Sequence, residues 1–249
     1  PLSHWHGLVM GLSGIIYHGN TLYLQERFDP EATLNALSSG LVTFYTHISI
    51  AYIEMVKQPK KDHYDLSHVR LLVSASSALP PAVSDKFKKR FGLSILECYG
   101  SSETGRIASN RLDDRRTGTP GKLLPGVKGR INKDHELEVL TPGLFPGYYH
   151  NPQATREKTT KDGWWKTGDI AELNNGYVSL KGRIQERIKR NGLTLYPRDI
   201  EWALMQHPQM KEAFVMGVQR KDDPNDRLVV FLATVIVVGE VISFSKQSL

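Results

Sequence analysis

Short apolar runs alternate with amphipathic segments along the first hundred residues of the chain. The runs that predict buried strands lie at residues 41–45, 69–74 and 94–98. The segments that predict helices lie at residues 48–57 and 80–91, and another helix is expected to begin at Asp29-Pro30-Glu31, where Asp can cap the first turn. Strands that alternate with helices usually pair in parallel and are covered by those helices. The pattern therefore predicts a layered α/β fold.

The pattern changes near residue 117, where Gly and Pro become frequent. The segments TGTPGKLLPGV and TPGLFPGYY are typical of short strands joined by turns. Further along, Asn174-Asn175-Gly176 separates two alternating runs and predicts a tight hairpin. We therefore expect a small β-rich region from about residue 117 onward.

A smaller α/β domain is predicted at the C-terminal end. A helix is expected at residues 196–206, followed by strands at 213–218 and 228–238. We place the domain boundary after residue 183, which assigns residues 1–183 to a larger domain and residues 184–249 to a smaller one.

Composition and charge narrow the class of protein. The chain has 249 residues, of which 40% are apolar and 23% are charged, and this excludes a disordered or fibrous chain. Lys and Arg number 32 and Asp and Glu 26, so 32 − 26 gives a net charge of +6. This charge suits anionic partners such as nucleotides, coenzyme A or nucleic acid. A surplus of solvated lysines explains it equally well.

Cysteine content and hydropathy bear on the compartment. One Cys excludes a disulfide framework and a Cys-based zinc cluster, and it fits a reducing compartment. The longest apolar run, residues 228–238, is short of the ~20 residues that span a bilayer, so we expect no transmembrane segment. No signal peptide is visible. We expect an intracellular protein, either cytoplasmic or in an organelle such as the mitochondrion or peroxisome.

The segment YGSSETG, residues 99–105, follows a predicted strand directly. The carboxyl edge of an open α/β sheet is where ligands usually bind. An aromatic ring there can stack on a base, hydroxyl groups can donate to phosphate, and Glu103 can hold Mg²⁺. The alternative is a tight turn followed by a helix with Ser102 as its cap.

Two other segments could contact the same kind of ligand. The loop SASSALP, residues 74–80, has small residues that let a flat ligand approach the backbone, or it is only a polar loop into a helix. In WWKTGD, residues 164–169, a carboxylate after a Gly turn could accept both hydroxyls of a ribose. The alternative there is a hairpin entry with Asp169 as a turn residue.

The remaining candidates are weaker. The basic stretch at 181–192 could contact nucleic acid, but aromatic residues are not interleaved with the basic ones and Glu186 interrupts the stretch. The alternative is a solvated basic edge, and we expect no nucleic-acid partner. His4-Trp5-His6 lacks further metal ligands at suitable spacing, which favours a packed or solvated pair. The phosphate loop of Walker-type NTPases, the Rossmann glycine fingerprint and the hydrolase nucleophile elbow do not occur in the sequence.

The order of the motifs is more specific than any one of them. The chain resembles the adenylate-forming (AMP-binding) superfamily, and it is most similar to acyl-CoA synthetases. The segments that carry the resemblance are PLSHWHGL, SASSALP, YGSSETG, GTPGKLLPGV, GYYHNPQATREKTTKDGWWKTGD, GRIQERIKRNG and YPRDIE. The resemblance implies part of the adenylate-forming fold, a layered α/β domain with a small β-rich region and a truncated α/β C-terminal lid. It also implies ATP, Mg²⁺ and coenzyme A as ligands, and a fatty or other monocarboxylic acid as substrate.

The resemblance also implies roles for individual residues. Tyr99 would stack on adenine, and Asp169 and Arg183 would hold the ribose. The other residues implied at the nucleotide are Ser76 and Ser77 in the adenine pocket, Gly100 and Ser101 beside Tyr99, Ser102 near phosphate, and Glu103 as the Mg²⁺ ligand. Tyr99, Glu103 and Asp169 are expected to converge on one nucleotide.

Three further positions are implied for later steps. Gln185 stands at the hinge, where the family usually has Asp or Lys. Lys189 lies near the site of the thioester step, and His4 matches the histidine of the acyl pocket.

Departures from the family pattern limit the expected activity. The phosphate loop and the C-terminal catalytic Lys of the family do not occur in this chain, and the pattern ends after Val238. Loss of one such group typically costs on the order of 10²–10³ in rate, so we expect an impaired ligase, a fragment of an acyl-CoA synthetase. The alternative is a non-catalytic nucleotide-binding or interaction remnant. Cys98 stands where malonyl-type members place Arg, and this favours a monocarboxylic acid.

Overall fold

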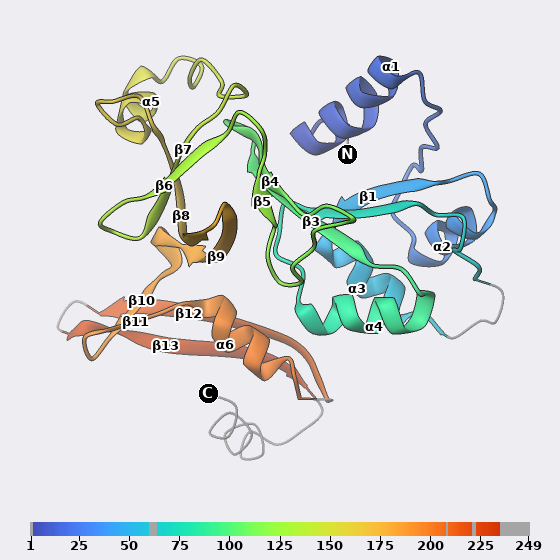
Figure 1. The fold of residues 1–249 in the computed structure, drawn as a ribbon. Helices are drawn as coiled ribbons and strands as arrows, with labels where there is room; N and C mark the ends of the chain where they lie inside the picture. The colour runs from blue at the N-terminus through green and yellow to red at the C-terminus, as the bar shows by residue number, and fades with distance from the viewer. Residues whose placement is uncertain (1, 60–63, 208, 221–222, 235–249) are drawn as a thin grey trace. The chain divides into compact units, whose positions relative to one another are not determined.

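The computed structural model describes residues 2–59, 64–207, 209–220 and 223–234, which form two compact units (Figure 1). The first unit comprises Pro1–Lys128, Leu140–Arg156 and Asn174–Val178. The second comprises Gly129–Val139, Glu157–Leu173 and Ser179–Leu249. The chain thus passes several times between the units, and the domain boundary expected after residue 183 stays a prediction.

The first unit contains the layered α/β fold that the sequence predicted. Its strands are β1 (Phe44–Ile48), β2 (Leu71–Ala75), β3 (Ile95–Ser101), β4 (Gly105–Ser109) and β5 (Lys122–Leu123). They are neighbours in that order, with β1, β2 and β3 parallel and β4 and β5 antiparallel. The first three strands therefore end at the same edge of the sheet.

Three helices lie together on one side of β1–β3, and the N-terminal helical segment lies on the other side (Figure 1). The first unit contains η1 (His6–Ser13), α1 (Gly14–His18), α2 (Pro30–Ser38), α3 (Ser49–Lys57) and α4 (Pro81–Phe91). A core of fully buried side chains, among them Leu34, Tyr52 and Phe87, joins α2, α3 and α4 to the sheet. The hydroxyl of Tyr52 donates to the carbonyl of Val73 at 2.8 Å. This bond fixes α3 directly on β2.

The predicted start of α2 and the predicted end of α4 are confirmed by the structure. Asp29 Oδ1 accepts the N–H of Ala32 at 2.7 Å, so Asp29 is the predicted cap of α2. Helix α4 ends at Gly92, whose φ of 75° stops the helix.

The first strand was predicted three residues too early. It runs over Phe44–Ile48 rather than 41–45. Leu41 is 84% exposed, and the N–H groups of Arg70 and Leu71 both donate to the carbonyl of Thr43. Pairing with β2 therefore starts only after Thr43.

The β-rich part contains four longer strands. They are β6 (Lys128–Ile131), β7 (Glu136–Leu140), β8 (Trp165–Asn174) and β9 (Tyr177–Arg183), with the short helix α5 (Pro152–Lys158) before β8. Their order is β9-β8-β7-β6. Asn175 and Gly176 both have positive φ, 52° and 82°, and this confirms the predicted turn between β8 and β9.

The C-terminal part of the second unit has its own core. It contains η2 (Ile184–Glu186), β10 (Ile188–Arg190), β11 (Leu193–Leu195), α6 (Pro197–Leu204), β12 (Met210–Arg220) and β13 (Asp223–Thr234). Helix α6 packs on β12, and the buried side chains of Ile188, Leu204 and Val215 lie between the elements. The strands expected at 213–218 and 228–238 fall in β12 and β13, with 235–238 outside the described residues.

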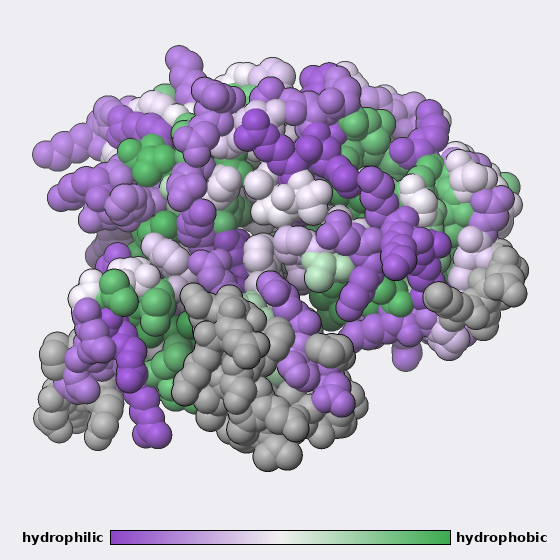
Figure 2. Space-filling model, turned by 60° about the horizontal axis from the view of Figure 1, so that its bottom comes forward, coloured by the Kyte–Doolittle hydropathy of each residue, from purple (hydrophilic) through white to green (hydrophobic). Residues whose placement is uncertain are grey.

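Hydrophilic side chains predominate on the face of the molecule drawn in Figure 2, with hydrophobic ones between them. In the part of the chain that the structure describes, no helix combines the length and apolar character needed to cross a bilayer.

The core of the first unit gives a stability prediction. Phe87→Ala removes a fully buried ring that contacts Tyr52 and Phe91, so we expect a loss of about 3–5 kcal/mol in the free energy of unfolding. Urea unfolding followed by circular dichroism measures it. Leu41→Ala, at an exposed position, is the control and should change the midpoint little. A similar shift for both variants would contradict the packing described here.

Candidate functional site

Two of the predicted segments meet at the carboxyl edge of the first unit. Ser76 and Ser77 follow β2, and Tyr99 to Ser101 end β3, its parallel neighbour. Ser76 is exposed and has a φ of 68°, and Ser77 is also exposed. The structure therefore brings the small-residue loop and the Tyr99 segment to one edge of the sheet, as the sequence predicted.

The turn after β3 is tightly closed. A Cβ on Gly100 would collide with the carbonyl oxygen of Gly105, so a side chain does not fit there. The buried hydroxyl of Thr104 accepts the N–H of Ser101 at 3.2 Å and donates to the carbonyl of Gly105 at 3.0 Å. The chain then returns as β4. The alternative of a helix capped by Ser102 is therefore wrong, and Ser102 lies exposed at the turn.

Glu103 is half-buried, and its carboxylate has a hydrogen-bond donor that the sequence did not predict. The hydroxyl of Tyr148 donates to Glu103 Oε1 at 2.8 Å, and the N–H of Phe145 donates to the Glu103 carbonyl at 2.7 Å. Burial raises the pKa of Tyr148 to about 12, and the bond to Glu103 adds to this shift. Tyr148 lies in the GYYHN motif already quoted for the resemblance, but nothing in the sequence indicated that it contacts Glu103.

The N-terminal histidines lie in different environments. The ring of His4 is exposed, and its backbone carbonyl accepts the N–H of Leu8. His6 instead forms a hydrogen bond between its Nε2 and Thr46 Oγ1 on β1, at 2.8 Å. Burial lowers the pKa of His6, with Arg106 and His47 acting in the same direction. Across the described residues, no cluster of three or more His, Cys, Asp or Glu could hold a metal.

In the second unit, Asp169 lies inside β8 and is 7% exposed. It is therefore a strand residue, and the alternative of a turn residue is wrong. Its Oδ1 pairs with Arg183 Nε at 2.9 Å, and Arg183 is exposed at the end of β9. The structure thus brings together the two residues that the resemblance implied at the ribose.

Contacts from β7 hold the segment before Asp169. Glu136 Oε1 accepts the N–H of Gly168 at 2.8 Å, and Thr167 Oγ1 donates to the carbonyl of Leu137 at 2.7 Å. Gly168 has a φ of 79°, and the N–H of Asp169 donates to Thr167 Oγ1 at 3.1 Å. Contacts with β7 therefore hold Thr167 and Gly168, the two residues immediately before Asp169.

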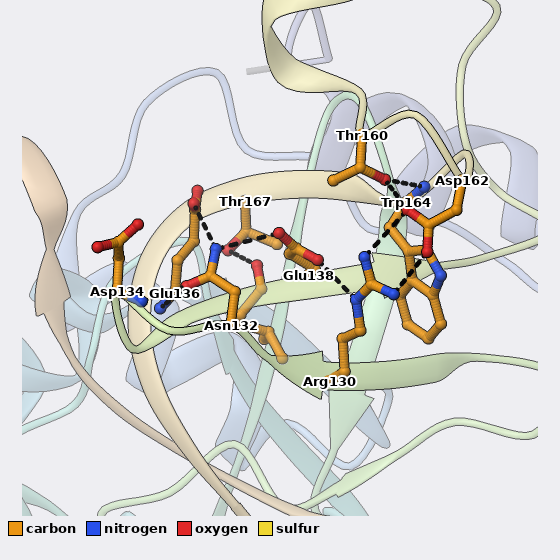
Figure 3. A network of polar contacts seen from close by, with 10 residues as sticks. Arg130, Asn132, Asp134, Glu136, Glu138, Thr160, Asp162, Trp164 and Thr167 are labelled. Carbon is orange, nitrogen blue, oxygen red and sulfur yellow. Dashed lines mark hydrogen bonds and ion pairs between the residues drawn. The ribbon is translucent and has the colours of Figure 1, made fainter.

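A polar network continues from Glu136 along the strands (Figure 3). The side-chain amide of Asn132 donates to Glu136 Oε2 at 3.3 Å and to Glu138 Oε1 at 3.0 Å. Arg130 Nε donates to Glu138 Oε2 at 2.7 Å, and its Nη1 donates to Asp162 Oδ2 at 2.6 Å. This pairing lowers the pKa of Asp162 to about 2. The nearly buried carboxylates of Glu136 and Glu138 thus have hydrogen-bond donors.

The residues expected near the hinge and the thioester step are exposed. Gln185 lies in η2, and Lys189 lies in β10, where its backbone N–H donates to Asp226 Oδ2 at 2.6 Å. In the basic stretch, Lys181 pairs with Glu172 on the surface at 3.2 Å.

The implied nucleotide residues fall into two groups. Tyr99 and Glu103 belong to the first unit, and Asp169 and Arg183 belong to the second. Their convergence on one nucleotide stays a prediction.

The chain matches known proteins over most of its length. Residues 1–149 match the sequence profile of AMP-binding enzymes. The malonate–CoA ligase of Arabidopsis thaliana is 32% identical over 250 residues, which cover 89% of this chain and 41% of that protein. A mitochondrial medium-chain acyl-CoA ligase of Danio rerio is 31% identical over 237 residues, which cover 88% of this chain and 39% of the relative.

Solved structures agree with these matches. The crystal structure of ATP-bound MatB from Rhodopseudomonas palustris matches this chain with a TM-score of 0.91 and 26% sequence identity. The match covers 100% of this chain and 52% of the MatB chain. The chain therefore spans less than half of the two curated relatives and about half of this structure.

The support of Asp169 by β7 can be tested. Glu136→Ala leaves the N–H of Gly168 without its acceptor, which typically costs about 1–3 kcal/mol. We expect faster hydrogen exchange at Gly168 and Asp169, measured by NMR. Glu172→Ala is the control, because among the described residues the Glu172 side chain forms an exposed ion pair with Lys181, of the kind that contributes about 0–1 kcal/mol. Equal exchange in both variants would show that Glu136 does not hold this segment.

Proposed function

Because the chain belongs to the AMP-binding enzyme family, we propose that it forms the nucleotide-binding part of an acyl-CoA synthetase. Such an enzyme activates a carboxylic acid with MgATP and transfers the acyl group to coenzyme A. The observation that carries the proposal is the closed turn at Gly100, which presents Tyr99 and Glu103 at a sheet edge beside Ser76 and Ser77. We propose an intracellular compartment, cytoplasmic or organellar.

In this proposal the nucleoside is held by one aromatic ring and one ion pair. Tyr99 stacks on the adenine, and the loop of Ser76 and Ser77 lines the pocket. Asp169 accepts hydrogen bonds from the ribose hydroxyls. Arg183, paired with Asp169 at 2.9 Å, orients that carboxylate.

The triphosphate would lie along the turn that follows Tyr99. The exposed Ser102 offers a hydroxyl donor there, which suits a phosphate oxygen, while Gly100 and Ser101 shape the turn that presents it. A single carboxylate together with phosphate oxygens is a donor set that Mg²⁺ commonly uses, so Glu103 fits this ion. Bound Mg²⁺ would screen the negative charge of the phosphates. Tyr148, which donates to Glu103, would hold the carboxylate in place.

The proposed reaction has two steps. A carboxylate oxygen of the acid attacks the α-phosphorus of ATP, and pyrophosphate leaves with the electrons of the broken P–O bond. The thiolate sulfur of coenzyme A then attacks the acyl carbon, and AMP leaves. His4 near the acid and Lys189 near the thioester step remain proposed roles for these two stages.

Binding of a stable intermediate mimic tests the proposal. A 5′-O-(N-acylsulfamoyl)adenosine contains adenine, ribose and an acyl group but no triphosphate. We expect Tyr99→Ala to weaken its binding about 5- to 150-fold, from loss of ~1–3 kcal/mol of stacking. We expect Asp169→Asn to weaken it about ten- to a hundredfold, since a hydrogen bond to a charged group is worth ~1.5–3 kcal/mol. Isothermal titration calorimetry measures both.

Asp113→Asn is the matched control, because the exposed Asp113 pairs with the exposed Arg111 at the surface. It should leave the affinity unchanged. If the unmodified chain does not bind the mimic, or if all three variants bind alike, the proposal is wrong. Pyrophosphate release with ATP, Mg²⁺ and a panel of acids then distinguishes a working ligase from a module that only binds the nucleotide.

A further inference from the structure

Arg106 is a half-buried cation with little to neutralise it. It lies on β4, paired in register with Gly100 of the closed turn. One of its nitrogens, Nη2, lies 3.0 Å from the sulfur of Met10 on η1. Within the residues that the structure describes, Arg106 makes no ion pair. A thioether sulfur is a weak acceptor, and a guanidinium has five N–H donors, so most of its hydrogen-bonding capacity is unused by this contact.

The acidic residue nearest to Cys98 on β3, Glu97, is already bonded elsewhere, because its carboxylate accepts the N–H groups of Leu79 and Gly118. Arg106 lies close enough to Cys98 and His6 for its charge to oppose the ionisation of His6 and favour that of Cys98. Burial nevertheless raises the pKa of Cys98 and lowers that of His6, so both are neutral near pH 7. A partly buried guanidinium with unused N–H donors can form charge-assisted hydrogen bonds to a bound anion, and these are stronger than bonds between neutral groups. The site is therefore complementary to a bound anion.

The position of Arg106 separates it from the proposed adenine pocket. Successive side chains of a strand point to opposite faces, so Cys98 and Tyr99 face opposite sides of β3. Arg106 pairs in register with Gly100, which shares the face of Cys98, and its side chain contacts Met10 on η1, so it lies on the side away from the Tyr99 ring. If adenine stacks on Tyr99, an anion at Arg106 belongs to another part of the ligand. That part is the acyl group, because Arg106 contacts η1, which follows His4, the residue that the resemblance implies at the acyl pocket.

We propose that Arg106 binds a second carboxylate of the acid substrate, so that the substrate is a short dicarboxylic acid. This inference rests on the proposed function. It differs from the monocarboxylic acid that Cys98 favours in the sequence, because an Arg on the neighbouring strand reaches the space beside Cys98. Guanidinium matches a carboxylate through two parallel N–H···O bonds, and this geometry selects a planar anion.

Two acyl-adenylate mimics that differ in one charge test the inference. The malonyl mimic has a terminal carboxylate, and the butyryl mimic has a methyl group at the corresponding position. We expect the chain to bind the malonyl mimic more tightly. Arg106→Met should weaken malonyl binding about ten- to a hundredfold and change butyryl binding by less than about threefold. Retained butyryl binding shows that the variant is folded. Arg111→Met, at an exposed arginine, is the matched control and should change neither affinity.

Each other outcome overturns the inference in a different way. If Arg106→Met weakens both mimics equally, Arg106 is only structural, while the proposed function stands. If butyryl binds more tightly and Arg106→Met has no effect, the substrate is a monocarboxylic acid. If the variant loses affinity for ATP but for neither mimic, Arg106 contacts phosphate instead. If the unmodified chain binds neither mimic, the proposed function fails and the inference fails with it.

Discussion

The close approach of β3 and β4 at Gly100 is the constraint on which the first unit's candidate site depends. A residue with a Cβ would collide with the Gly105 carbonyl, so only glycine lets the two strands close there. The closure sets three positions at once. Tyr99 stays at the end of β3, Glu103 stays at the tip of the turn, and Arg106 is brought opposite Gly100. The spacing of the candidate ligand groups therefore follows from one backbone contact, which Thr104 reinforces from inside the turn.

The second unit positions its candidate ligand group by a similar principle. Gly168 adopts a positive φ immediately before Asp169, and buried acceptors on β7 satisfy the backbone and hydroxyl donors of this segment. Glu136 would be costly to bury alone, but Asn132 and Gly168 both donate to it. The network in Figure 3 therefore serves the geometry of Asp169 as well as the stability of the strands. In both units a glycine gives the conformation, and a buried polar side chain keeps it.

Charge explains how such a site could choose its substrate. Two other arginines of the described chain have anionic partners, since Arg183 pairs with Asp169, and Arg130 pairs with Glu138 and Asp162. Arg106 differs because its contact is a sulfur atom. The inference about a dicarboxylic acid follows from this difference in pairing. The relatives do not decide the matter, because they include ligases named for malonate and for medium-chain acids.

Local sequence determined several helix ends and turns, and tertiary structure decided the contacts and where the first strand starts. The cap at Asp29, the stop at Gly92 and the turn at Asn175-Gly176 depend on backbone geometry within a few residues, so the sequence alone predicted them. The order of the motifs likewise identified the family. The pairs Glu103–Tyr148 and Met10–Arg106 join residues 45 and 96 positions apart, and residue periodicity carries no information about such distances. Only the folded chain brings these side chains together, because strand pairing and helix packing, rather than local propensity, determine which distant residues become neighbours.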